Sequence, residues 1–370
     1  RRRRRIAAAR VAVDACALEI DPRIPRGKLA HGEPYRPRET HEQEHHGRLA
    51  LHRALDLGVI FFDTANVYGA GHSERVLARA FAGLRDQVVI ATKFNALFDE
   101  ATREVTGSSA IPADIRQACE DSLRRLDTDY IDLYQFHWPD NRTGTPVEES
   151  WGVMAELVQA GKVREIGCSN FDPSQLSEAL AVSAGAGHPA FVCDQVQYSM
   201  VHRQPETNGL ADLCRETGVS LLPYYPLASG LLTGKTRRGG EPQGRLKMDR
   251  YQEFLTEENF DLVDGLERFA SERGVTQVQV ALGWLLAQEA VPPSDDARLA
   301  NVIPNSEPAA EWRTRSRYDR SFRTAIGVVD QIITMFTELP EDMTTSDIAY
   351  EAARGNLHQN EPEQRQRHPA

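Results

Sequence analysis

Four polar residues in the first half of the sequence carry side chains that could together reduce a carbonyl group: Asp63, Tyr68, Lys93 and His137. A hydride that adds to a carbonyl carbon leaves an alkoxide, and the alkoxide oxygen needs a proton donor. A tyrosine can be that donor when a nearby ammonium lowers the pKa of its phenol, and a carboxylate can hold the ammonium in place. A histidine can hydrogen-bond the carbonyl oxygen and orient the substrate. Each residue type alone is commonly a cap, a packing residue or a satisfied polar group, but the four together predict carbonyl reduction.

Short apolar runs alternate with amphipathic segments through the part of the sequence that contains these residues. We expect strands at residues 59–63, 88–93, 130–137, 163–168, 191–197 and 219–224. We expect helices at 113–127, 205–217 and 275–290, and further helices that begin at Ser73, at Thr145 in a capping box with Glu148, and after Asp172. Continuous apolar runs are typical of parallel strands buried on both faces. The seven visible βα units predict an α/β fold, a (β/α)8 TIM barrel with outer helices. A doubly wound open sheet is the alternative.

The carboxyl ends of barrel strands face one shared pocket, so polar residues at those ends are candidates for the site. Asp63, Lys93 and His137 close three strands, and Tyr68 lies in the loop after the first of them. Later strand ends carry Ser169, Asn170, Gln195 and Tyr224.

Composition limits the classes of partner and compartment. The 370 residues have a formal net charge of −11, which argues against nucleic acid as a partner because phosphate backbones require an excess of Lys and Arg. No apolar run is long enough for a membrane span, so no membrane partner is expected. Five scattered cysteines indicate free thiols in a reducing, cytoplasmic compartment. We expect a partly disordered arm at 1–40, the barrel at 41–320, and a C-terminal helix and polar tail at 321–370. A homo-oligomer is compatible with this composition.

Six segments together resemble the aldo/keto reductase family, in its longer bacterial-type and potassium-channel-β-like branch. They are residues 57–69, 89–93, 122–137, 161–171, 195–198 and 223–235, with the texts LGVIFFDTANVYG, VIATK, SLRRLDTDYIDLYQFH, GKVREIGCSNF, QVQY and PYYPLASGLLTGK. The resemblance covers about residues 48–290. It implies a barrel that reduces small-molecule aldehydes or ketones to alcohols with NADPH, which becomes NADP+.

The resemblance also implies a role for each matching residue. Tyr68 is the acid/base, Lys93 lowers its pKa, Asp63 holds Lys93, and His137 orients the carbonyl. Ser169, Asn170 and Gln195 hold the nicotinamide carboxamide, and Tyr224 stacks on the ring. The loop that wraps the pyrophosphate corresponds to Pro226, Leu227, Ser229, Gly230, Leu232 and Lys235. Arg245 lies near the adenosine 2′-phosphate. No metal site is implied.

Both ends of the barrel depart from the family pattern. Residues 1–40 show no Gly-rich first strand, and Asn305–Pro308 replaces the Gly loop after the strand at 302–304. Thr314 and Arg315 occupy the place of the usual Glu-Asn pair. These departures favour a second hypothesis, a catalytically weak or inactive barrel that acts as a cofactor-binding or regulatory subunit. A third hypothesis, a zinc hydrolase, rests only on the H-E-x-x-H pattern at residues 41–45. Which carbonyl is the substrate does not follow from the sequence.

Overall fold

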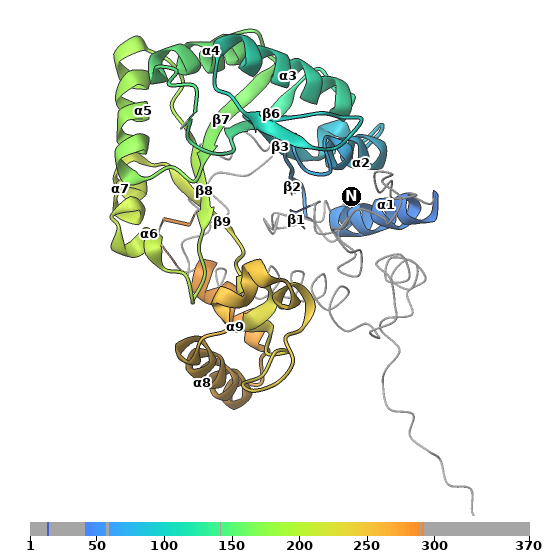
Figure 1. The fold of residues 1–370 in the computed structure, drawn as a ribbon, viewed down its shortest axis with the longest axis vertical. Coiled ribbons are helices and arrows are strands. Elements are labelled where there is room, and N and C mark those ends of the chain that lie inside the picture. The colour runs from blue at the N-terminus through green and yellow to red at the C-terminus, as the bar shows by residue number, and fades with distance from the viewer. Residues whose placement is uncertain are drawn as a thin grey trace, which may run out of the picture.

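The computed structural model describes residues 13–14, 41–56, 59–140, 142–286, 288 and 290–291. Seven parallel strands form one sheet in the order in which they occur in the chain: β1 (Val13–Asp14), β2 (Phe61–Asp63), β3 (Val89–Phe94), β6 (Ile131–Phe136), β7 (Val163–Ser169), β8 (Cys193–Gln197) and β9 (Ser220–Tyr224). Parallel neighbours in sequential order need a crossover after each strand. Figure 1 shows the sheet curled, with the crossover helices in an arc on its outer side.

Helices lie outside the sheet, and all but the first of them fall in segments for which the alternating pattern predicts a helix. They are α1 (His41–Asp56), α2 (His72–Ala80), α3 (Pro112–Leu126), α4 (Val147–Gln159), α5 (Pro173–Ala186), α6 (Gln204–Thr207) and α7 (Leu210–Thr217). The structure confirms the predicted barrel architecture. The strand at 302–304, residues 305–370 and all of the arm at 1–40 except β1 lie outside the described residues. β1 pairs in parallel with β2, so a two-residue first strand is present where the sequence showed none.

Side chains of the strands alternate between two apolar layers. Phe62, Ile90 and Tyr134 belong to the main core, which also contains apolar side chains of the helices. Val89 and Leu133 belong to a smaller cluster that contains strand residues and the residues beside them. Both faces are therefore buried, which explains why these strands read as unbroken apolar runs.

Three of the predicted helix boundaries are wrong. Ser73 is not the N-cap of α2, because the helix already begins at His72. The hydroxyl of Ser73 instead accepts a hydrogen bond from Thr64. The capping box at Thr145 is absent, since α4 begins after Pro146 with no side-chain cap. The segment at 205–217 divides into α6 and α7 at Gly209, whose φ of 86° lies in the left-handed region that glycine adopts readily. Asp172, in contrast, caps α5 in a complete capping box with Gln175.

A lobe beyond β9 has its own apolar core. It contains three short 3-10 helices (Ala228–Thr233, Gly244–Lys247 and Asp249–Phe254), α8 (Glu257–Arg273) and α9 (Gln277–Leu286). Leu231, Phe254 and Phe260 are buried together there. The sequence pattern predicted α9 and missed α8. Among the described residues, no helix is both long and apolar enough to cross a membrane.

A cluster of charges surrounds the fully buried Asp132 near the amino end of β6, and we call it the amino-end cluster. Arg85 Nη2 and Arg164 Nη1 lie 2.6 Å and 2.7 Å from the two oxygens of Asp132, and the amide of Ile90 donates to the same carboxylate. Both guanidinium groups also stack on the ring of Tyr130, at about equal distances of 4.0 Å and 3.9 Å. The carboxylate has three donors, so the cluster is satisfied without any ligand.

Candidate active site

Asp63 and Lys93 form a buried ion pair at the carboxyl ends of β2 and β3. Lys93 Nζ donates to Asp63 Oδ2 at 2.5 Å and to the carbonyl oxygen of Thr64 at 2.8 Å. Gln135 Nε2, on the adjacent strand β6, donates to the other carboxylate oxygen at 3.4 Å. The side chain of Lys93 is only 1% exposed. Because a buried ammonium must be paired, Asp63 fixes both the charge and the position of Lys93.

Residues 64–73 run from the end of β2 into the first turn of α2 and carry Tyr68; we call them the Tyr68 loop. Lys93 Nζ lies 5.2 Å from the centre of the Tyr68 ring. The ring of His137 meets the Tyr68 ring edge-on, with centres 5.7 Å apart and planes at 82°. The structure therefore brings the four predicted residues Asp63, Tyr68, Lys93 and His137 together, although they span 75 positions of the chain.

His137 follows the last residue of β6. Burial, reinforced by the positive charge of Lys93, lowers the pKa of His137 from 6.5 to about 3. The imidazole is therefore neutral at the pH of a cell, with one ring nitrogen that donates and one that accepts. A neutral imidazole can donate a hydrogen bond without adding a second positive charge beside Lys93.

The predicted carboxamide-binding residues form one hydrogen-bonded group next to His137. Asn170 Nδ2 donates to the carbonyl oxygen of His137 at 3.1 Å and to Ser169 Oγ at 2.9 Å, while Tyr224 OH donates to Asn170 Oδ1 at 2.8 Å. Ser169 Oγ donates to the carbonyl oxygen of Gln195 at 2.7 Å. Asn170 has a φ of 63°, a left-handed conformation that asparagine tolerates better than most residues. These four residues lie together as predicted.

The loop after β9 contains the residues predicted to bind the pyrophosphate. Ser229 and Gly230 have φ angles of 55° and 105°, which break the short helix Ala228–Thr233 into two turns. Leu232 is buried in the core of the lobe, as part of the frame of the loop. Ser229 Oγ is buried and has no hydrogen-bond partner within the described part of the chain. Buried hydroxyls normally have a hydrogen-bond partner, and a phosphate oxygen bound here would supply one for Ser229.

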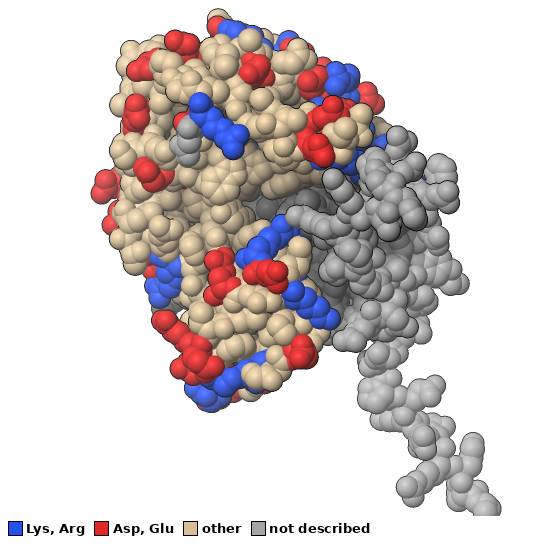
Figure 2. All heavy atoms as spheres, in the orientation of Figure 1, with Lys and Arg blue, Asp and Glu red and all other residues tan. Residues whose placement is uncertain are grey.

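Pro226, Leu227 and Arg245 are half-buried at the same loop, and Lys235 is exposed at its end. Burial and the hydrogen bond to Tyr251 raise the pKa of Tyr225, against a smaller lowering effect of the Arg245 guanidinium. Arg245 therefore lies near the loop. Figure 2 shows this face of the molecule hollowed between the arc of helices and the lobe of α8 and α9.

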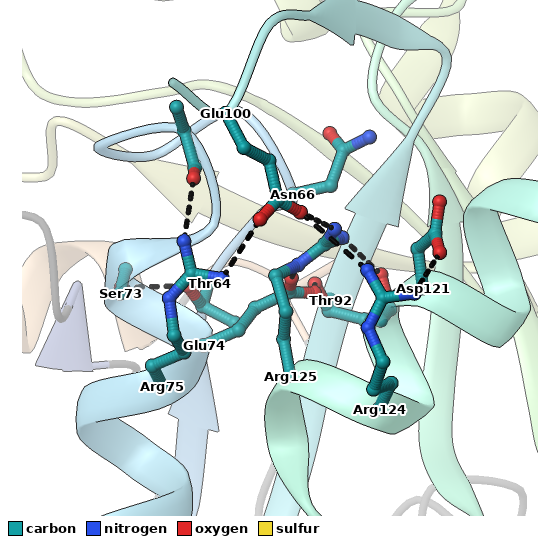
Figure 3. Close-up of polar contacts among 12 residues, drawn as sticks. Thr64, Asn66, Ser73, Glu74, Arg75, Thr92, Glu100, Asp121, Arg124 and Arg125 are labelled. Atoms are coloured by element: carbon teal, nitrogen blue, oxygen red, sulfur yellow. Dashed lines mark hydrogen bonds and ion pairs between the residues drawn. The ribbon is translucent and has the colours of Figure 1, made fainter. Parts of the chain in front are cut away.

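Sequence reasoning missed several residues that support the site. Gln135 contacts Asp63, and Asn95 donates to the carbonyl oxygen of Trp138 at 2.9 Å. Asn95 precedes a hairpin, β4 (Ala96–Phe98) and β5 (Val105–Ser108), that the apolar pattern did not predict. Glu74 and Arg125 form a buried ion pair (Figure 3), and Arg125 packs against Gly71 of the Tyr68 loop. Strand-end reasoning could have pointed to Gln135, but Glu74 and Arg125 lie on helices.

The H-E-x-x-H pattern at residues 41–45 begins helix α1, and its side chains lie outside the described part of the chain. Among the described residues, no group of three or more His, Cys, Asp and Glu side chains could hold a metal. The four described cysteines, Cys119, Cys168, Cys193 and Cys214, are all buried free thiols.

Comparison with known proteins places this arrangement in a family. The sequence profile of the "Aldo/keto reductase family" matches residues 33–316. A probable aldo-keto reductase 1 from Glycine max is 35% identical over 269 residues, which cover 71% of this chain and 74% of the relative. The aldo-keto reductase yakc [NADP(+)] from Schizosaccharomyces pombe is 35% identical over 253 residues, 66% of this chain and 72% of the relative. The glycerol dehydrogenase AKR11B4 from Gluconobacter oxydans has a similar structure, with a TM-score of 0.59, 28% identity, and coverage of 82% and 90%.

Proposed function

Because this chain belongs to the aldo/keto reductase family, we propose that it reduces small-molecule aldehydes or ketones with NADPH and that Tyr68 donates the proton. The observation that carries the proposal is the position of Lys93, which bonds Asp63 at 2.5 Å and lies 5.2 Å from the centre of the Tyr68 ring. When bound, the cofactor supplies the hydride for the carbonyl carbon. The oxygen of the resulting alkoxide takes its proton from the Tyr68 hydroxyl.

Three residues prepare Tyr68 for this role. The ammonium of Lys93 favours the phenolate that remains after proton transfer, because an opposite charge nearby stabilises the charged form. Asp63 keeps Lys93 in place through the buried ion pair. His137 stays neutral because burial and Lys93 hold its pKa at about 3. Its imidazole can therefore hydrogen-bond the carbonyl oxygen and orient the substrate beside Tyr68.

The residues around Asn170 fit the nicotinamide end of the cofactor. Ser169, Asn170 and Gln195 present amide and hydroxyl groups of the kind that hold a carboxamide, and Tyr224 presents a half-buried ring for stacking. Gln195 is 5% exposed, and its carbonyl oxygen accepts the hydrogen bond from Ser169 that joins it to this group.

The loop after β9 fits the phosphate end. Its members, in this proposal, are Pro226, Leu227, Ser229, Gly230, Leu232 and Lys235. The unpartnered Ser229 hydroxyl supports a phosphate contact there. Arg245 would pair with a 2′-phosphate, and the relative named as using NADP(+) supports NADPH over NADH. The buried free thiols support a cytoplasmic location.

Two measurements on purified protein test this function. The first is a fluorescence titration with NADPH, and the second is the rate of NADPH oxidation with para-nitrobenzaldehyde. Tyr68→Phe should retain NADPH binding and lose about 10³-fold in kcat, since a general acid typically contributes that much. The matched control is Tyr130→Phe, which removes one hydroxyl from the amino-end cluster and should leave kcat unchanged.

Three outcomes decide between the hypotheses. Turnover that disappears only in Tyr68→Phe supports the reductase. Tyr68→Phe that turns over as fast as the parent contradicts the role of Tyr68. NADPH binding without turnover of any carbonyl in a broad aldehyde and ketone panel would favour the regulatory subunit instead.

A further inference from the structure

A buried ion pair lies next to the Tyr68 loop, in contact with Gly71 of the loop and with Thr92 of β3. Arg125 Nε of α3 lies 2.6 Å from Glu74 Oε2 of α2, and the two side chains are 4% and 0% exposed (Figure 3). Arg125 Nη2 also donates to Ser122 Oγ at 3.2 Å. None of the candidate catalytic residues contributes to this pair, so the chemistry proposed above does not account for it.

Glu74 connects the pair to the strand that carries Lys93. Thr92 Oγ1 donates to Glu74 Oε1 at 2.7 Å, and Thr92 immediately precedes Lys93 in β3. Both oxygens of Glu74 are therefore occupied, one by β3 and one by α3. Any shift of α2 against β3 has to break a buried hydrogen bond or the buried ion pair.

Arg125 contacts the Tyr68 loop itself. Gly71 has a φ of 81°, and a Cβ added there would lie 2.4 Å from Arg125 Cδ, so the loop backbone rests against the arginine stem. The end of the loop is fixed to its beginning, because Thr64 Oγ1 donates to Ser73 Oγ at 2.7 Å and the amide of Ser73 donates to the carbonyl oxygen of Tyr68 at 3.3 Å.

A second, more exposed carboxylate, that of Glu100, also contacts Arg125. Glu100 accepts from Arg125 Nη1 at 3.0 Å and from Arg75 Nη1 at 3.2 Å. Arg75 Nη2 in turn donates to the carbonyl oxygen of Ala70, inside the Tyr68 loop, at 3.2 Å. Arg125 thus reaches the loop by two routes, by direct packing on Gly71 and through Glu100 and Arg75.

Burial of two charges is weak support for stability, since desolvation offsets much of their attraction. The pair does, however, link α2 to α3, and the bond from Thr92 links α2 to β3. We propose that Glu74 and Arg125 are positioning residues, which hold the Tyr68 loop against the strand of Lys93 so that Tyr68 and Lys93 stay at their working distance. The inference rests on the proposed role of Tyr68 as proton donor.

The main variant is Arg125→Met, which keeps an unbranched stem and removes the guanidinium. A displacement of a reacting group by about 1 Å can lower the rate roughly 100-fold, so we expect kcat to fall by 10- to 100-fold on that scale. The KM for the aldehyde and the Kd for NADPH should change much less than kcat. Arg125→Lys retains a cation for Glu74 and should recover most of kcat.

The pH profile separates positioning from a general loss of structure. In the reverse reaction, oxidation of the alcohol by NADP+, the phenolate of Tyr68 is the base, so kcat rises with pH. The charged and titratable groups around Tyr68 are Lys93, its partner Asp63, and His137. If Lys93 is less well placed in Arg125→Met, its charge favours the phenolate less, and the rising limb should move to higher pH.

The matched control is Arg85→Met, which removes an arginine from a buried carboxylate, Asp132, in the amino-end cluster. Both variants should lose thermal stability, but only Arg125→Met should lose kcat and shift its profile. If Arg125→Met does not fold, the double variant Glu74→Gln/Arg125→Met is used in the same assays, because it leaves neither charge of the pair buried. Equal effects on kcat in the two arginine variants, or an unmoved profile, would overturn the positioning role.

The assay on Tyr68→Phe keeps the two proposals apart. An inactive Tyr68→Phe with a fully active Arg125→Met overturns only the positioning role. A fully active Tyr68→Phe overturns the proposed function on which that role rests.

Discussion

Two buried carboxylates of the barrel, Asp63 and Asp132, have different surroundings. Asp63 lies at the carboxyl end of β2 and has one close cation, Lys93, with a weaker contact from Gln135 at 3.4 Å. Asp132 lies near the amino end of β6, where Arg85, Arg164 and a backbone amide occupy both of its oxygens.

The cations that pair with these two carboxylates differ in the aromatic rings that they contact. The guanidinium groups of Arg85 and Arg164 both stack on the ring of Tyr130, as well as binding Asp132. Lys93 lies near the ring of Tyr68, beside the neutral His137. A carboxylate that is saturated by arginines serves the fold, whereas one that holds a single lysine beside a phenol can serve chemistry. This contrast agrees with the location of barrel active sites at the carboxyl ends of strands.

The largest expected effect in this comparison is that of Lys93→Met on turnover. The substitution leaves Asp63 buried without its cation and Tyr68 without the adjacent charge, so kcat should fall by about 10² to 10⁴. Steady-state kinetics of carbonyl reduction measure it, with NADPH binding as the check that the protein is folded. A kcat within threefold of the parent would contradict the proposed functional role of the pair of Asp63 and Lys93.

Asp132→Asn should have the opposite profile, with a loss of stability and no loss of turnover. It removes the charge that Arg85 and Arg164 share, and breaking a buried pair of this kind costs about 3 kcal/mol of unfolding free energy. Urea denaturation measures the loss, and kcat below the transition should equal that of the parent. Asp212→Asn is the control, because its exposed pair with Arg215 contributes about 0.5 kcal/mol or less. A stable Asp132→Asn, or one with impaired kcat, would contradict the structural role of the amino-end cluster.

A third buried carboxylate, Asp194 on β8, sharpens the comparison because neither of its oxygens has a hydrogen-bond partner of normal geometry among the described residues, although the Phe171 amide and the Cys168 thiol lie near it. Burial raises the pKa of Asp194 from 3.8 to about 7, against smaller lowering effects of the Phe171 amide and the Cys168 thiol. The folded protein therefore binds more protons than the unfolded chain between these two values, and the stability derived from this group falls as the pH rises through that range.

Asp194→Asn should remove this dependence. We expect the variant to be more stable than the parent at pH 8, on the order of 1 to 2 kcal/mol, and the difference to shrink or reverse at pH 5, where the parent carboxyl is protonated. Thermal unfolding of both proteins at the two pH values measures it. A difference that is the same at both values would show that Asp194 is already ionised at pH 5 in the folded protein, so that its pKa is not raised into this range.

Most of the candidate catalytic residues could be predicted, because their positions depend on the local sequence pattern. Asp63, Lys93 and His137 each end or follow an apolar run, and parallel strands bring such ends to one side of the sheet. The helix caps were less predictable. Ser73 is a good N-cap residue, yet its hydroxyl accepts a hydrogen bond from Thr64, nine residues earlier, and α2 begins before it. Local propensity cannot report a competing tertiary partner of this kind.

The sequence by itself determined the order of strands β2, β3 and β6 to β9 and of most of their crossover helices, the burial of both strand faces, and which polar residues lie at strand ends. These properties follow from periodicity and from the geometry of parallel βα units. Only the tertiary structure decided which charges pair. Arg125 and Glu74 are 51 residues apart on two helices, and Asp132 and Arg85 are 47 residues apart. Burial makes an unpaired charge costly but does not name its partner, so partners become known only when the packing of helices on the sheet brings them into contact.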